Sequence, residues 1–98
     1  MTEKSIVNAI VKYLESLPRC HVVKTCGAML PAGTPDLIGC YDGWAFAFEV
    51  KRPGEKATAI QKYDLEQWMH AGAVVAVVTS VRDVDMAFAD FFSGEKIK

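Results

Sequence analysis

The chain opens with hydrophobic residues that recur at helical spacing. Six apolar residues between Ile6 and Leu17 form one stripe and predict an amphipathic helix from about Glu3 to Leu17. Thr2 is suited to cap this helix, and Pro18 is expected to end it.

The pattern then changes to one that is typical of strands. A run rich in Val and Thr predicts a strand at about 21–26, and Gly and Pro punctuate a loop from Gly27 to Pro35. Two further strands are expected at about 36–41 and 44–51. Asp42-Gly43 between them favours a type I′ hairpin turn, which needs positive φ at both positions.

The second half begins with another helix, predicted at about 59–71. Thr58 can cap it, and Gly72 can end it in a left-handed conformation. Val74–Thr79 is almost continuously apolar, as expected of a strand that is covered on both faces.

Ser80 and Asp83 resemble a capping box at the start of a last helix that should end near Phe92. The order is therefore helix, three strands, helix, strand, helix. A right-handed crossover would place the last strand parallel to the third. We expect an α/β fold, a mixed sheet flanked by helices, with residues 1–98 forming one domain.

Composition supports a globular protein, since 51% of the residues are hydrophobic and 23% are charged. The sequence has no apolar run long enough to span a membrane and no signal-peptide core. We therefore expect a soluble cytoplasmic protein. The three cysteines are expected to be small buried residues rather than disulfide partners, and a zinc site from Cys20, His21 and Cys26 is an alternative.

The net charge of −1 argues against a nucleic-acid partner, because phosphate binding usually needs a basic surface. The charge is uneven, however. Four cations against two anions lie between Glu49 and Lys62, and this stretch could form a local basic patch.

The hairpin register brings candidate chemistry together. If Asp42 and Gly43 are the turn residues, Asp36 lies opposite Glu49, and Lys51 projects to the same side. Like charges opposite one another destabilise a sheet, so the two carboxylates need either a shared proton or a hard divalent cation.

A divalent cation beside a lysine ammonium is suited to phosphodiester hydrolysis. The cation activates water, and the ammonium stabilises charge that develops on the phosphoryl oxygens. Gly33 and Gly39 leave the neighbouring backbone slim, which would let a bulky substrate backbone approach.

The motif around these residues resembles a known family. Gly33–Ile38, Phe48–Gly54 and Gln61 resemble the PD-(D/E)XK nuclease pattern and, within it, the virus-type replication-repair nuclease (VRR-NUC) domain. This resemblance implies a restriction-endonuclease-like αβββαβ core with a C-terminal helix. It implies Asp36, Glu49 and the Val50 carbonyl as ligands of Mg²⁺ or Mn²⁺.

The resemblance also implies that Lys51 is the catalytic lysine and that Gln61 and Glu3 belong to the site. Gln61 has a second interpretation, because it follows Thr58 at capping-box spacing. Glu3 also has one, since a carboxylate is favoured in the first turn of any helix.

The family implies DNA as the partner. The resemblance further implies a structure-selective endonuclease that acts as a homodimer on Holliday junctions or other branched DNA, in DNA repair, for a phage in its bacterial host. Two other functions stay open. One is a non-catalytic nucleic-acid-binding or assembly module, and the other is a hydrolase of smaller phosphoesters.

Overall fold

The computed structural model describes residues 1–26 and 29–97, with side chains described through Gly94. Gly27 and Ala28, which we expected in a loop, lie outside the described residues. The elements follow the predicted order: α1 (Glu3–Ser16), β1 (Cys20–Lys24), β2 (Leu37–Tyr41), β3 (Trp44–Val50), α2 (Ala59–His70), β4 (Val74–Val78) and α3 (Val81–Ile97).

The strands form one mixed sheet in the order β1-β2-β3-β4. β1, β2 and β3 pair antiparallel, and β4 is parallel to β3, as predicted. Asp42 and Gly43 have φ values of 53° and 86°, which a type I′ turn requires. The register follows from this turn, with Tyr41 opposite Trp44 and Leu37 opposite Phe48.

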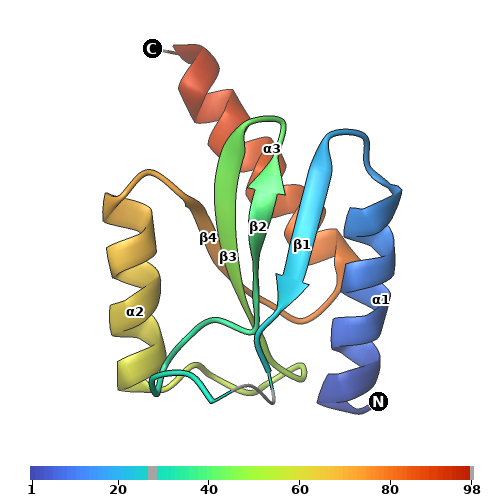
Figure 1. The fold of residues 1–98 in the computed structure, drawn as a ribbon, viewed down its shortest axis with the longest axis vertical. Helices are drawn as coiled ribbons and strands as arrows, with labels where there is room; N and C mark the ends of the chain where they lie inside the picture. The colour runs from blue at the N-terminus through green and yellow to red at the C-terminus, as the bar shows by residue number, and fades with distance from the viewer. Residues whose placement is uncertain (27–28, 98) are drawn as a thin grey trace.

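Alternation along the strands divides the sheet into two faces. Phe46, Phe48 and Val50 belong to the main hydrophobic core, which α1 and α3 cover. Ala47 and Glu49 point to the opposite face, where α2 packs against β3 and β4. Figure 1 shows α2 on one side of the strands, α1 on the other, and α3 running behind them.

The helix caps agree with the sequence. The Thr2 hydroxyl accepts the N–H of Ser5 at the start of α1. Thr58 and Gln61 form a reciprocal capping box at the start of α2, and Gly72 follows that helix with φ 106°. Three helix boundaries therefore follow from local chemistry.

α3 differs from the prediction at both ends. The Ser80 hydroxyl accepts the Asp83 N–H, but the Asp83 carboxylate bonds to the N–H and hydroxyl of Thr79 rather than to Ser80. The helix also continues to Ile97 instead of ending near Phe92. Gly94 lies within it, and one glycine costs only about 1 kcal/mol, which is too little to end a helix by itself.

The predictions about burial were correct only in part. Helices α2 and α3 both pack against β4, as expected of a strand covered on both faces, but Val77 is 40% exposed because α2 covers its face only in part. Cys26 and Cys40 are exposed and Cys20 is half-buried, so these cysteines are not core residues; all three are free.

The two glycines near the candidate site serve internal packing. A Cβ on Gly39 would lie 2.0 Å from the carbonyl oxygen of His21, and one on Gly33 would lie 2.4 Å from a methyl carbon of Ile60. The protein's own backbone and side chains take up the space that we expected a substrate to use.

In the part of the chain that the structure describes, no helix is long and apolar enough to cross a membrane.

Candidate active site

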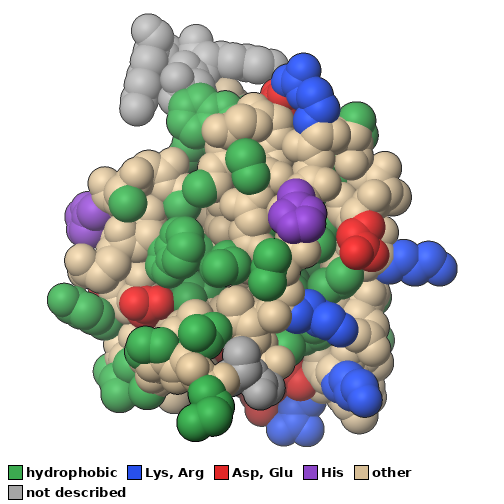
Figure 2. All heavy atoms as spheres, viewed as in Figure 1, with side chains coloured by type: hydrophobic (Ala, Val, Ile, Leu, Met, Phe, Trp, Pro, Cys, Tyr) green, Lys and Arg blue, Asp and Glu red, His purple; other side chains and the backbone are tan. Residues whose placement is uncertain are grey.

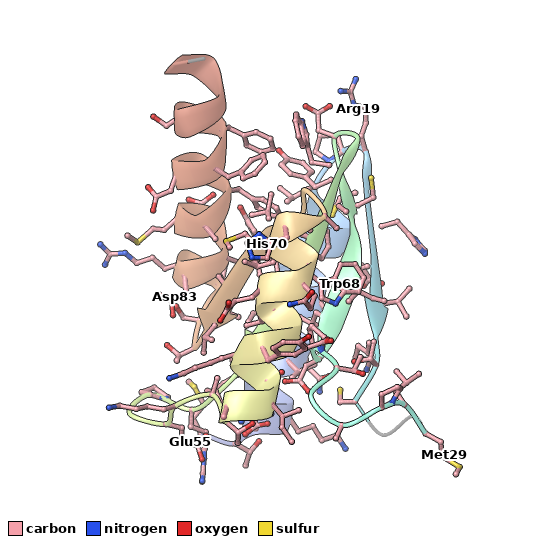
Figure 3. All side chains as sticks on the ribbon, turned by 90° about the vertical axis from the view of Figure 1, so that its left-hand side faces the viewer. Arg19, Met29, Glu55, Trp68, His70 and Asp83 are labelled. Atoms are coloured by element: carbon pink, nitrogen blue, oxygen red, sulfur yellow. The ribbon has the colours of Figure 1, made fainter. Side chains whose placement is uncertain are left out.

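The candidate site lies at one end of the sheet. Figure 1 shows that α1 and β2 begin there, β1 and β3 end there, and α2 begins nearby. Figure 3 places Glu55 at this end, and Arg19 and the hairpin tip at the opposite end. Segments that are far apart in the sequence therefore present polar side chains to one region.

Asp36 is held from both neighbouring strands. Its carbonyl oxygen accepts the backbone N–H of Thr25 at 2.8 Å, which continues the β1–β2 pairing beyond the strand ends. Its carboxylate oxygen Oδ2 accepts the backbone N–H of Val50 at 2.9 Å. Thr25 itself is buried, and its hydroxyl donates to the carbonyl oxygen of Pro35. Sequence reasoning missed this support, because a buried Thr in a strand has no distinctive local signal.

Glu49 lies near the end of β3 and is only 2% exposed. Its Oε2 accepts a hydrogen bond from Gln61 Nε2 at 3.1 Å, and Lys51 Nζ lies 3.8 Å from the same oxygen. Its other oxygen, Oε1, is buried and has no hydrogen-bond partner among the described residues. A buried carboxylate oxygen without a partner is costly, which marks this atom as one with a further role.

The electrostatics of Glu49 show that Asp36 is its direct neighbour. Burial is the largest cause that raises the pKa of Glu49, followed by the nearby Asp36 carboxyl group. Lys51 lowers the pKa and Glu3 raises it slightly, and the result is about 8. Leu37 pairs with Phe48, so the same register places Asp36 opposite Glu49, and the effect of Asp36 on the pKa of Glu49 agrees with this placement.

Gln61 takes part in both of the arrangements that the sequence suggested. Its Oε1 accepts the backbone N–H of Thr58 at 2.8 Å, and its own backbone N–H donates to the Thr58 hydroxyl at 3.2 Å. Because Oε1 is occupied by the cap, the Nε2 group is directed toward Glu49. The cap therefore orients the amide for its contact with the carboxylate.

Lys51 and Glu3 complete the surroundings. The Lys51 side chain is 14% exposed and lies on the same side as Glu49, as predicted. Glu3 is an exposed residue in the first turn of α1 and lines a cavity together with Asp36. Both residues are near the carboxylate pair, which is compatible with the predicted roles.

The donor set suits a small hard cation. Among the described residues, no group of three or more His, Cys, Asp or Glu side chains is placed to hold a metal ion, so the zinc alternative has no support. The predicted ligands are two carboxylates and the main-chain carbonyl of Val50, and the unpartnered Glu49 Oε1 supplies an available oxygen. A divalent cation or a proton would satisfy this oxygen.

The expected basic patch is partly neutralised. Arg52 donates from its guanidinium and from its backbone N–H to the Glu55 carboxylate, both at 2.8 Å. Hydrogen bonding to Arg52 holds the pKa of Glu55 down at about 2. Arg52 is therefore a partner of Glu55, and Lys51 faces Glu49, which leaves fewer free cations here than the sequence indicated.

The other residues near the site were not found from the sequence. A cavity of 360 Å³ opens beside Asp36, between the first turns of α1 and the end of β1. Its lining includes Lys4, Asn8, Lys24 and Cys26. These residues come from separate segments with ordinary local patterns, so no motif joins them.

Fold and site together define an α/β protein of the restriction-endonuclease-like class. A solved structure of a VRR_NUC domain matches 89% of this chain and 94% of its own, with 27% sequence identity and a TM-score of 0.72. A second, a VRR_NUC domain protein, matches 91% of this chain and 86% of its own at 19% identity and a TM-score of 0.70, and shows the same fold. No protein-family model and no curated protein matches the sequence.

The likeness to the first of these structures supports assigning the chain as a VRR-NUC domain, and so as a nuclease-family domain. The family assignment made from Gly33–Ile38, Phe48–Gly54 and Gln61 is confirmed.

Proposed function

We propose that this domain is a divalent-metal-dependent endonuclease that hydrolyses DNA phosphodiester bonds. Its active site would consist of Asp36, Glu49 and Lys51. The observation that carries the proposal is the state of Glu49. This carboxylate is buried, its pKa is raised by the nearby Asp36 carboxyl group, and it keeps one oxygen without a partner among the described residues. An inert structural site would not be expected to retain such an arrangement, because it costs stability.

The roles follow from the contacts. Asp36, Glu49 and the Val50 carbonyl would hold Mg²⁺ or Mn²⁺, which when bound would supply Lewis-acid activation of water and of the phosphoryl group. Val50 N–H fixes one oxygen of Asp36, and Gln61 fixes one oxygen of Glu49. The oxygens left over are the ones available to the cation.

Lys51 supplies a positive charge within the same site. Its ammonium is nearly buried and 3.8 Å from Glu49, so its position is constrained before substrate arrives. In hydrolysis, water adds to phosphorus, the bond to the leaving oxygen breaks, and a proton passes to that oxygen. The Lys51 ammonium would stabilise the negative charge that develops on the phosphoryl oxygens.

The experiment is a cleavage assay on labelled DNA with Mg²⁺, Mn²⁺ or EDTA. We expect cutting only with a divalent cation, and loss of cutting in Lys51→Ala. Lys12→Ala is the matched control, since Lys12 is exposed on α1 and lies outside the basic stretch from Glu49 to Lys62. If cleavage by Lys51→Ala equals that of the unaltered protein, the domain is better described as a binding or assembly module.

The proposal extends to branched DNA and a homodimer. One copy of 98 residues covers little DNA, and a symmetric dimer would present two active sites to a four-way junction. Cleavage of labelled junctions, flaps and plain duplex at equal concentration tests the preference for branched DNA. Sedimentation of the protein alone tests whether it is a dimer. Equal cutting of junction and duplex, or a monomer that cuts junctions, would remove it and leave the nuclease proposal in place.

A further inference from the structure

The cavity between α1 and β1 is lined by both acidic and basic residues. Asp36 and Glu3 line the side that belongs to the candidate active site, while Lys4, Lys24 and Asn8 also line the cavity. Its volume of 360 Å³ is at the lower end of the range for small-ligand sites. The space is therefore suited to one nucleotide rather than to a length of duplex.

The two lysines are available for a ligand. Ion pairs in the described part of the chain join Arg19 to Asp42, Lys51 to Glu49 and Arg52 to Glu55, and none involves Lys4 or Lys24. Figure 2 shows Lys and Arg side chains gathered at the lower right, over the end of β1 and the first turns of α1.

We propose that this cavity binds the nucleotide adjacent to the scissile phosphate on the strand that is cut. Lys4 and Lys24 bind its phosphate, Asn8 supplies amide hydrogen bonds, and Val7 provides an apolar wall. A polynucleotide suits this arrangement because its phosphates repeat along the strand. One phosphate meets the carboxylate end, where the proposed cation would lie, and the next meets the lysines.

This inference rests on the proposed function, but it has a test of its own. Cys26 is exposed and lines the cavity, whereas Cys40 is exposed on the sheet and is absent from the lining. Peptide mass spectrometry measures the rate at which iodoacetamide alkylates each thiol. The probe is a short single-stranded oligodeoxynucleotide in EDTA, so that no cleavage occurs. We expect the oligonucleotide to slow alkylation of Cys26 and to leave the rate at Cys40 unchanged.

The lysines provide matched variants. Lys24→Gln and Lys4→Gln should each lose the protection of Cys26, and Lys12→Gln, on the exposed side of α1, should retain it. In DNA cleavage the first two should raise KM with little change in kcat. The slope of log affinity against log salt should become shallower by about 1 for each lysine.

The outcomes separate the two proposals. If the protein cuts DNA but the oligonucleotide leaves the alkylation rate of Cys26 unchanged, the subsite is wrong and the nuclease proposal stands. If Cys26 is protected but no divalent cation supports cutting, the subsite stands and the nuclease proposal is wrong. A loss of kcat at unchanged KM in Lys24→Gln, or equal protection by inorganic phosphate alone, would also overturn the nucleotide subsite.

Discussion

Two glutamates close together in the sequence have opposite electrostatic states. Glu49 is buried beside Asp36, and its pKa rises to about 8. Glu55, in the loop before α2, pairs with Arg52 at the surface, and its pKa falls to about 2. The comparison shows that charge pairing alone does not define a site. Glu55 has a satisfied partner and a structural role, while Glu49 keeps an oxygen that the described protein groups leave unused.

The largest expected difference between the two glutamates is catalytic. Glu49→Gln keeps the shape of the side chain but removes the charge that would hold the cation. We expect its cleavage rate to fall by a factor on the order of 10²–10³. Glu55→Gln should leave the rate unchanged, since Glu55 bonds to Arg52. Single-turnover cleavage of one DNA substrate measures the rates of both variants. Equal losses of rate would contradict the distinction between the two glutamates.

The next difference concerns stability and pH in EDTA. The folded protein keeps a proton on Glu49 up to pH about 8, whereas the unfolded chain loses it near pH 4.5. Between these values the folded state binds more protons, so the free energy of unfolding should fall as pH rises, by at most ~1.4 kcal/mol per pH unit. Glu49→Gln should show a weaker pH dependence. Urea unfolding at several pH values tests this expectation, and identical profiles for both proteins would contradict it.

A smaller effect is expected at Gln61, which joins the cap of α2 to Glu49. Gln61→Ala removes both contacts and should destabilise the protein by about 1 kcal/mol. Gln61→Glu keeps a capping-box acceptor for the Thr58 N–H but has no amide to donate to Glu49. This variant should largely retain the helix cap while losing activity. Urea unfolding with cleavage rates separates the two roles, and full activity in Gln61→Glu would restrict Gln61 to capping.

The smallest effect is expected from the surface pair itself. Arg52→Gln should barely change stability at neutral pH, because exposed ion pairs contribute little. Its contribution is present above pH 4.5 and is lost as pH falls toward 2, since pairing lowers the pKa of Glu55. Thermal unfolding should therefore show a small difference between Arg52→Gln and the unaltered protein near neutral pH, and this difference should disappear as the pH falls from 4.5 toward 2. A difference that persists near pH 2 would assign Arg52 a role beyond this pair.

The predictable part of the molecule is the part that local chemistry determines. Asp42-Gly43 fixes a turn type, the turn fixes the register, and the register places Asp36 beside Glu49. Thr58 and Gln61 were predicted as a cap for the same reason. Roles of the site residues stay predictions, but their positions follow from short segments with strong conformational preferences.

The unpredicted part depends on tertiary packing. The packing of Gly39 against His21 and the cavity beside Lys24 each require segments whose relative placement the sequence pattern does not encode. The length of α3 was also missed, since the last helix was expected to end near Phe92 and it continues to Ile97. Glu49 was expected at the site, but the degree of its burial depends on how α2 covers β3.

The shared amide of Gln61 also constrains how this region can change. The same side chain starts a helix and holds a carboxylate, so the turn between Lys51 and Thr58 and the first turn of α2 behave as one unit. An insertion or deletion in that turn would misplace the amide even if the helix re-formed. Transplanting the site to another scaffold would therefore require the whole stretch from Glu49 to Gln61, rather than the acidic residues and the lysine alone.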